Sequence, residues 1–256
     1  MILAEDATEG YHDEGKFPNL LILEEALARL ASTILVFAES PGSIGELGAF
    51  AAVDIIRDKT VAVIDRHHEV RPSFIKDGPL ASLRALTGEH VYYYDLLNDE
   101  EPPHLMLAYL NDHFSDLAEA LKHREASLDK TQIFDPKQPK HIMLLLSDLA
   151  HLFRAVTKTE LENLCGHFGC EFTAHQIDQY LFVLRKLSLI QYFEYGGTPW
   201  YTSDRDFMEY VGSNDKSIDA TRMGVRISRY LAGADSKKAK AFRSHQRTSI
   251  SSRVKV

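Results

Sequence analysis

The chain has 256 residues, of which 45% are hydrophobic and 26% are charged, enough for one large or two small folded domains. This composition excludes a disordered polymer, and no apolar run approaches the roughly 18 residues of a membrane span. The first ten residues, MILAEDATEG, carry acids where a secretory signal carries basic residues. We therefore expect a cytoplasmic protein that makes no membrane contact.

The net charge of −8 is divided unevenly along the chain. From Lys216 onward there are eleven Lys and Arg residues and two acidic ones, whereas the preceding part has 18 basic and 35 acidic residues. A basic end on an acidic body favours contact with a polyanion such as nucleic acid, although solvated basic tails are also common. We expect residues 233–256 to form a basic tail without fixed structure.

The first half of the chain alternates short β-rich runs with helical patterns. Continuous β-branched and aromatic runs predict parallel strands that are covered on both faces: Thr33–Phe37, Thr60–Ile64 and His90–Tyr94. Helical patterns cover residues 19–30, 44–56 and 105–124, and residues 95–103 have the composition of a loop. We expect an α/β domain over residues 1–128, followed by a Pro-containing linker over residues 129–140.

The second half has a different order of elements. Three helical patterns, over 142–153, from Thr157 and from Thr173, precede a hairpin pattern over 192–202 with a Gly-Gly turn. This order predicts a mainly helical winged helix-turn-helix domain over residues 141–232, although interaction modules also combine helices with a hairpin. On the third helix, we expect DNA or a partner to contact four polar residues: Gln176, Gln179, Arg185 and Lys186.

The stretch ESPGSIGELGAF, which follows the first predicted strand, is the best candidate for a site. A Gly-containing turn between a parallel strand and a helix is where open α/β sheets bind ligands. Ser43 and Glu46 also have the spacing of a capping box, in which each would bond the other's backbone amide and do nothing more.

A functional interpretation uses the same residues. Glu46 in the first helical turn would be held ionised by the helix dipole and could attack the anomeric carbon of a sugar. Gly42 and Gly45 would leave room for a ribose ring, and the hydroxyls of Ser40 and Ser43 could bond its hydroxyl groups.

At these residues the chain resembles nucleoside 2-deoxyribosyltransferase-like proteins, in which an Asp-x-Gly-Thr-x-x-Glu turn supplies a nucleophilic glutamate. More narrowly, it resembles the N-glycosidase effector toxins encoded beside bacterial retron reverse transcriptases. The segment RPSFIKDGP, residues 71–79, looks like the "R-S-F-I-x-x-G-P" segment of those effectors, and their second domain agrees with the winged-helix prediction.

The resemblance implies a fold and roles for single residues. It implies a flavodoxin-like sheet, with Glu46 as nucleophile, Ser43 at the family's threonine, Gly42 at its glycine and Ser40 at its first aspartate, which is a departure. In the second motif, Arg71, Ser73 and Asp77 either line the same pocket or order a loop. The family's first strand is missing ahead of MILAED, for which we favour a truncated gene model.

The activity that the resemblance implies is cleavage of the N-glycosidic bond of a nucleotide, without a cofactor. No second carboxylate can be assigned as the acid, although Glu39 and Asp6 are candidates. A site with one dependable carboxylate suits NAD, whose nicotinamide leaves from a cationic bond, better than a neutral purine.

The implied setting is anti-phage defence. The retron reverse transcriptase and its multicopy single-stranded DNA (msDNA) would hold the toxin inactive. A homo-oligomer or a filament is the candidate assembly of the chain itself. The competing hypothesis is a DNA-binding regulator with a nucleotide-sensing α/β domain. It draws on the winged-helix pattern and the basic end.

No metal site is expected. Cys165 and Cys170 lack a second ligand pair and are expected to be buried, reduced thiols. His67 and His68 follow a strand, where adjacent side chains point to opposite sides and make a poor metal pair. Trp200 is expected to cover the core rather than to stack on a base.

Overall fold

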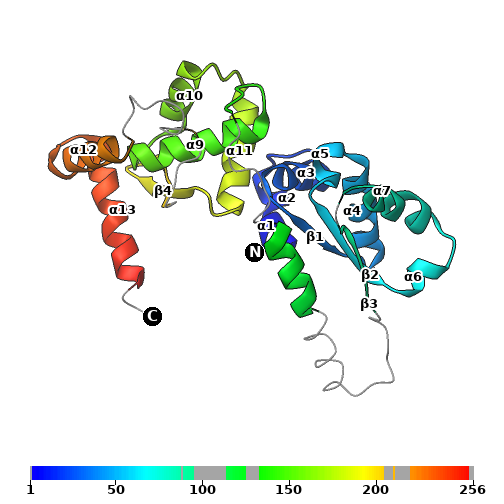
Figure 1. The fold of residues 1–256 in the computed structure, drawn as a ribbon. Coiled ribbons are helices and arrows are strands. Elements are labelled where there is room, and N and C mark those ends of the chain that lie inside the picture. The colour runs from blue at the N-terminus through cyan, green and yellow to red at the C-terminus, as the bar shows by residue number, and fades with distance from the viewer. Residues whose placement is uncertain are drawn as a thin grey trace. The chain divides into compact units, whose positions relative to one another are not determined.

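A computed structural model describes residues 2–87, 89–94, 114–124, 133–204, 210 and 220–253 (Figure 1). The chain forms two compact units: residues 25–132, and residues 1–24 together with 133–256. The second boundary falls within the linker expected at 129–140. The first 24 residues, which we expected in the α/β domain, instead belong with the C-terminal half.

The unit of residues 25–132 contains a three-stranded parallel sheet. Its strands are β1 (Ile34–Phe37), β2 (Thr60–Asp65) and β3 (Val91–Tyr94), paired in that order, so the three predicted strands are confirmed. Phe37 lies opposite Val63, and Val63 lies opposite Tyr92. The direct pairing leaves no gap between these strands for a missing one, and the flavodoxin-like order stays a prediction.

Both faces of this sheet are covered. On one face Val36, Ala62 and Ile64 pack in a core cluster with side chains of the helices that follow each strand, Leu47 and Leu83 among them. On the other face a second cluster joins three strand residues to Leu117 of the helix at 114–124: Val61, Val63 and Tyr94. Side chains therefore alternate between two helical layers, as expected of an α/β fold.

Helices precede β1 and connect the strands. They are α3 (Leu20–Leu30), α4 (Pro41–Ala52), α5 (Asp54–Arg57), α6 (His67–Val70), the π-helix η1 (Lys76–Leu80) and α7 (Ala81–Arg84). The helix predicted over 44–56 is thus two helices that meet at Val53, which has extended backbone angles. Of the helix predicted over 105–124, residues 114–124 are described, and the loop predicted over 95–103 lies outside the described residues.

The C-terminal part of the other unit contains the predicted three helices and hairpin. These are α9 (Pro139–Phe153), α10 (Lys158–His167), α11 (Ala174–Lys186), β4 (Gln191–Tyr195) and β5 (Thr198–Thr202). The turn uses two glycines, Gly196 and Gly197, with φ of 59° and 66°, which only glycine adopts readily. Trp200 is 4% exposed and covers a core cluster, as expected. The winged helix-turn-helix assignment remains an interpretation.

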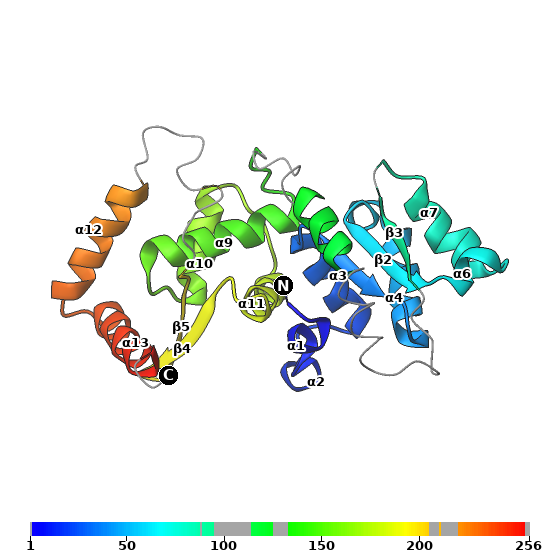
Figure 2. The same cartoon turned by 60° about the horizontal axis from the view of Figure 1, so that its bottom comes forward.

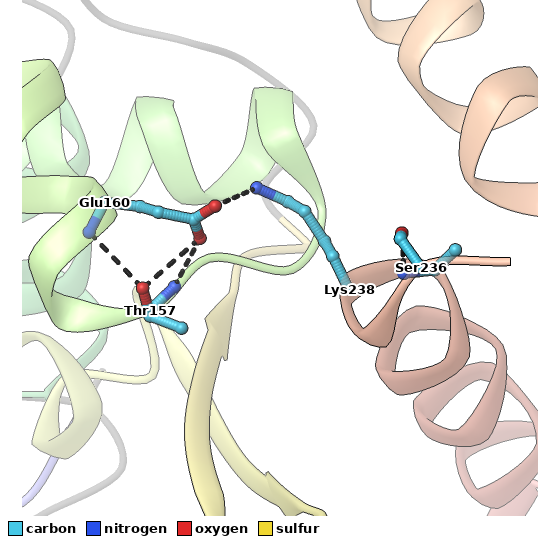
Figure 3. A network of polar contacts seen from close by, with 5 residues as sticks. Thr157, Glu160, Ser236 and Lys238 are labelled. Carbon is cyan, nitrogen blue, oxygen red and sulfur yellow. Dashed lines mark hydrogen bonds and ion pairs between the residues drawn. The ribbon is translucent and has the colours of Figure 1, made fainter. Parts of the chain in front are cut away.

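The expected disordered tail is wrong: α12 (Ala220–Gly233) is followed by a long helix, α13 (Lys237–Arg253). Ala239, Ala241 and Phe242 of α13 are buried with Leu231 of α12 and Trp200 of the hairpin. Lys238 bonds Glu160, whose carboxylate also caps the start of α10 (Figure 3). Apolar contacts on one side of α13 therefore fix a segment that composition alone marks as a solvated tail.

The first residues form α1 (Ala4–Thr8) and α2 (Tyr11–Glu14), which lie beside α11 (Figure 2). Phe17, 7% exposed, packs its ring 5.8 Å from that of Phe182. α11 also buries Ile177, Leu181 and Leu184, so it is covered on two sides. Across the described part of the chain, no helix is long and apolar enough to span a membrane.

Candidate functional site

The start of α4 is built by Ser40 and Pro41. Ser40 has extended backbone angles, as expected of a residue before proline, and Pro41 occupies the first helical position. Ser40 Oγ accepts a hydrogen bond from the Ser43 amide at 3.1 Å, and Ser43 Oγ accepts from the Ser40 amide at 3.0 Å. The capping box therefore joins Ser40 to Ser43, and the predicted pairing of Ser43 with Glu46 is wrong.

This cap changes the roles expected of the two serines. Ser43 Oγ also accepts from the Glu39 amide, and the Ser40 and Ser43 hydroxyls lie 3.1 Å from each other. Both hydroxyls are thus engaged in closing the turn. They fix the first turn of α4. To bind a sugar as well, each hydroxyl would have to form a further hydrogen bond in addition to these contacts.

Glu46 lies in the second turn of α4, because the helix begins at Pro41, and not in the first turn as expected. The helix dipole acts mainly on groups in the first turn. The proposed pre-charging of Glu46 by its own helix is therefore weaker than the sequence suggested.

Glu46 belongs to the face of α4 that points away from the core. Gly42, Gly45, Glu46 and Ala49 share one side by helical spacing, whereas Leu47, Phe50 and Ala51 are buried on the opposite side. A methyl group added at Gly45 would meet no atom within 4 Å, so this side borders open space. Glu46 is half-buried, and within the described residues its carboxylate takes part in no hydrogen bond or ion pair.

The second motif packs against the first. η1 contacts α4, and a methyl group added at Gly48 would lie 4.0 Å from Pro79 Cγ. Pro79 lies inside the π-helix. π-Helices are rare in proteins, and those that occur are often found at functional sites. The structure therefore brings residues 39–50 and 71–79 together within one unit.

Within the second motif, Ser73 has a structural role that the sequence left open. Its Oγ accepts from the Lys76 amide at 3.3 Å, and its carbonyl accepts from the Asp77 amide, which closes the turn before η1. Arg71 and Asp77 are exposed, and Phe74 is the most exposed large apolar side chain of the segment.

The carboxyl end of β2 carries a polar group that sequence reasoning set aside. Asp65 accepts hydrogen bonds from the His67 amide and from His67 Nδ1, and the rings of His67 and His68 stand 3.8 Å apart. The two histidines lie in α6, so the expectation of opposite directions on a strand was wrong. Burial and the neighbouring His67 lower the pKa of His68. A carboxylate-supported imidazole can hold and deliver a proton.

Arginines order the same edge of the sheet. Arg66 donates to the Tyr93 carbonyl at 3.0 Å, and Arg84 donates to the Tyr93 hydroxyl at 3.1 Å and to the Lys76 carbonyl at 3.1 Å. Burial raises the pKa of Tyr93. The signal available in the sequence was position alone: Arg66 and His67 come directly after β2, at the carboxyl end where ligands of parallel sheets bind.

The opposite edge of the sheet holds a cavity of about 650 Å³. His90 lies 2.8 Å from the Thr60 carbonyl through Nδ1, and its Nε2 lies 3.1 Å from Arg124 Nη1. A carbonyl oxygen accepts and a guanidinium donates, so Nδ1 carries the ring proton and Nε2 accepts from Arg124. Desolvation lowers the pKa of Arg124. Glu46 does not line this cavity.

The four residues expected to contact DNA or a partner are engaged within the chain. Gln176 caps α11 with Thr173, and Gln179 donates to the Lys16 carbonyl at 3.0 Å. Arg185 pairs with Glu14 at 3.4 Å, and Lys186 lies 5.6 Å from the centre of the Phe182 ring. Their side chains therefore bind the N-terminal segment or their own helix.

The remaining candidates behave as expected or lie elsewhere. Cys165 and Cys170 are buried free thiols, and burial raises the pKa of both. Of the candidate acids, Glu39 is exposed, and Asp6 belongs to the unit that does not contain Glu46. Among the described residues, no three His, Cys, Asp or Glu side chains gather as metal ligands.

Comparison with known proteins assigns the chain to a family. A protein of Escherichia coli named "Retron Ec86 putative ribosyltransferase/DNA-binding protein" is 40% identical over 73 residues, which are 28% of this chain and 24% of that protein. The chain thus matches about a quarter of that relative's length. The model of the STM3845 retron effector protein family matches residues 1–192, three quarters of the chain. The chain therefore belongs to the STM3845 retron effector protein family.

Proposed function

We propose that this retron effector cleaves the N-glycosidic bond of a nucleotide, with Glu46 as nucleophile and NAD as substrate. The observation that carries the proposal is the state of Glu46: half-buried, without a hydrogen-bond or ion-pair partner among the described residues, and beside the open space at Gly45. A carboxylate that capped its helix would be bonded to the backbone, as Glu160 is in α10. The name of the Ec86 relative includes "putative ribosyltransferase", which supports the same class of chemistry.

In this mechanism the Glu46 carboxylate attacks C1′ of the ribose. The bond from C1′ to the nicotinamide nitrogen breaks, and its electron pair leaves with nicotinamide, so the cationic ring becomes neutral. Water then cleaves the ester between Glu46 and the sugar, releasing ADP-ribose and a proton. No acid is needed for departure, which fits a site whose dependable carboxylate is Glu46.

The surrounding residues position this carboxylate. The cap of Ser40 and Ser43 fixes the first turn of α4, and the packing of Pro79 near Gly48 holds the second motif against that helix. Gly45 borders open space for the sugar, whereas a methyl group at Gly42 would lie 3.6 Å from Ser40 Oγ. Arg71 and Asp77, both exposed in the adjoining segment, would contact the rest of the nucleotide.

As an effector, the enzyme would stop growth of an infected cell by consuming the nucleotide. The reverse transcriptase and msDNA of the retron would hold it inactive until phage interferes. Membership of the retron effector family supports this setting.

The test is release of nicotinamide from NAD by the purified chain. We expect Glu46→Gln to abolish release and growth inhibition, whereas Glu160→Gln, a change of the same kind at the glutamate that caps α10, should retain both. A Glu46→Gln protein that still inhibits growth would favour the alternative, a winged-helix DNA-binding regulator whose α/β domain senses a nucleotide. The Ec86 relative's name, which includes DNA-binding, is the observation in favour of that alternative.

A further inference from the structure

The outer face of α12 carries a row of arginines. Arg222, Arg226 and Arg229 follow at spacings of four and three residues, so they share one side of the helix over about 10 Å. All three are exposed, and α12 contains no acidic residue. Arg226 and Arg229 form no ion pair or hydrogen bond with any described residue.

The opposite side of α12 is already used for folding. Leu231 is buried, Ile227 packs against the same core cluster, and Gly224 lies close to Leu152 of α9. The apolar face of this amphipathic helix is therefore covered by protein and is not available to a membrane surface, which would require it. What α12 offers to a partner is its cationic face.

α11, which the hairpin arrangement first suggests as a nucleic-acid reader, is not comparably open. Arg185 is paired with Glu14, and Gln179 donates to the Lys16 carbonyl. Phe182 is 3% exposed, beside Phe17. The acidic N-terminal segment covers the side of α11 from which a groove would be read.

Four cations in the first half of α13 also have partners within the chain. Lys238 pairs with Glu160 at 2.9 Å, Lys240 pairs with Asp235 at 2.8 Å, and Lys237 donates to Thr198 at 2.6 Å. Arg243 donates to three carbonyls at the end of α12. These charges hold the helix in place.

We propose that the outer face of α12 is a nucleic-acid contact surface, in which Arg226 and Arg229 bind backbone phosphates. A nucleic-acid duplex presents one negative charge per about 1.7 Å of its axis, and a row of guanidinium groups can bind several of them without reading sequence. Tyr230 and Val225, 66% and 55% exposed, flank the row. α12 lies beyond residues 1–192, which the family model matches. The inference does not depend on the glycosidase step.

The experiment measures binding of the full chain to a 20-base-pair DNA duplex of arbitrary sequence over a series of salt concentrations. The test variant is Arg226→Gln with Arg229→Gln. The matched control is Arg185→Gln with Lys186→Gln, which removes the same charge from α11. Circular dichroism melting verifies that both variants are folded.

We expect the α12 variant to bind all duplex sequences more weakly and to lower the slope of log affinity against log salt by about 2, one for each phosphate contact. The α11 variant should keep the slope of the unaltered chain. The proposal is overturned if the unaltered chain does not bind the duplex, if neither variant changes the slope, or if the α11 variant lowers it as much as the α12 variant. Duplex binding is measured without NAD, so this result and the nicotinamide assay can fail separately.

Discussion

The starts of α4 and α10 look alike in sequence and differ in structure. Each has a hydroxyl residue followed three positions later by glutamate, Ser43 to Glu46 and Thr157 to Glu160. In α10 this is a capping box, in which Glu160 accepts from the Thr157 amide at 2.9 Å. In α4 the cap lies one turn earlier, between Ser40 and Ser43, and Glu46 is left over.

The difference comes from Pro41. Proline suits the first helical position and holds the preceding residue in extended conformation, so Ser40 becomes the cap and Ser43 takes the place that glutamate takes in α10. A carboxylate not needed for capping is available for chemistry. Glutamates with the same local pattern can therefore be structural in one unit and a catalytic candidate in the other.

The largest expected effect is a difference in nicotinamide release between variants of these two glutamates. Glu46→Gln should lower nicotinamide release at least about 10³-fold, because an amide is a poor nucleophile, and should leave the melting temperature unchanged. Glu160→Gln should leave release unchanged. Rate assays and thermal melts of both variants test this, and similar activity losses in the two would contradict the comparison.

The next effect is on stability. Glu160→Ala removes the partner of the Thr157 amide and of Lys238, and should lower the free energy of unfolding by about 1 to 2 kcal/mol. Urea denaturation measures it. In a double-mutant cycle with Lys238→Ala, the two changes should be less than additive, whereas strict additivity would show that the contact in Figure 3 adds nothing.

Removing the capping hydroxyl of each helix tests why α4 and α10 differ. Ser40→Ala should cost about 1 kcal/mol of unfolding free energy, since the Ser43 amide loses its acceptor, and Ser40→Gly should cost only a few tenths. Because the cap aligns α4, nicotinamide release should fall with Ser40→Ala as well. Thr157→Ala should match the loss of stability and retain the activity.

Two glycines of α4 give a smaller effect. Alanine should stabilise the helix by about 0.5 to 1 kcal/mol at either Gly45 or Gly48, since each has a helical position without a forced φ. At Gly45 the added methyl enters the open space beside Glu46 and should raise the KM for NAD. At Gly48 it faces Pro79, and KM should stay the same.

Acid should weaken the docking of α13 slightly. The His245 ring stacks on Phe193 with ring centres 4.4 Å apart, and burial lowers the pKa of His245. The unfolded chain therefore takes up the proton first, so stability should fall as pH drops through the ordinary histidine pKa of about 6.5 and level off below the lowered value. Melting temperatures of the unaltered chain and His245→Phe between pH 7.5 and 5.0 should converge as the pH rises.

Local pattern predicted much of the fold. β-branched runs gave the three strands, and helical spacing with Thr157 and Thr173 gave α10 and α11, because periodicity and caps act within a few residues. The partnership of residues 1–24 with α11 was not predictable in this way. It rests on Phe17 meeting Phe182 and Glu14 meeting Arg185, contacts between segments more than 150 residues apart.

The candidate site was predictable in part for the same reason. The position of Glu46 after β1 followed from the strand, glycine and helix pattern, and its true place in the second turn required giving Pro41 more weight than the S-x-x-E spacing. The hydrogen bond between Asp65 and His67 forms because α6 begins directly after β2. Interpreting the two adjacent histidines as the end of a strand does not predict this contact.

The three bonds from Arg243 to the carbonyls of Leu231, Ala232 and Ala234 close the corner between α12 and α13. One guanidinium group thus fixes the angle between the two helices. A chain shortened to end at Ser236 would keep every arginine of α12 but lose the three hydrogen bonds from Arg243 and the buried Phe242. Without α13, Leu231 would lose its packing partners in that helix, and the guanidinium row would meet a rigid polyanion in many orientations instead of one.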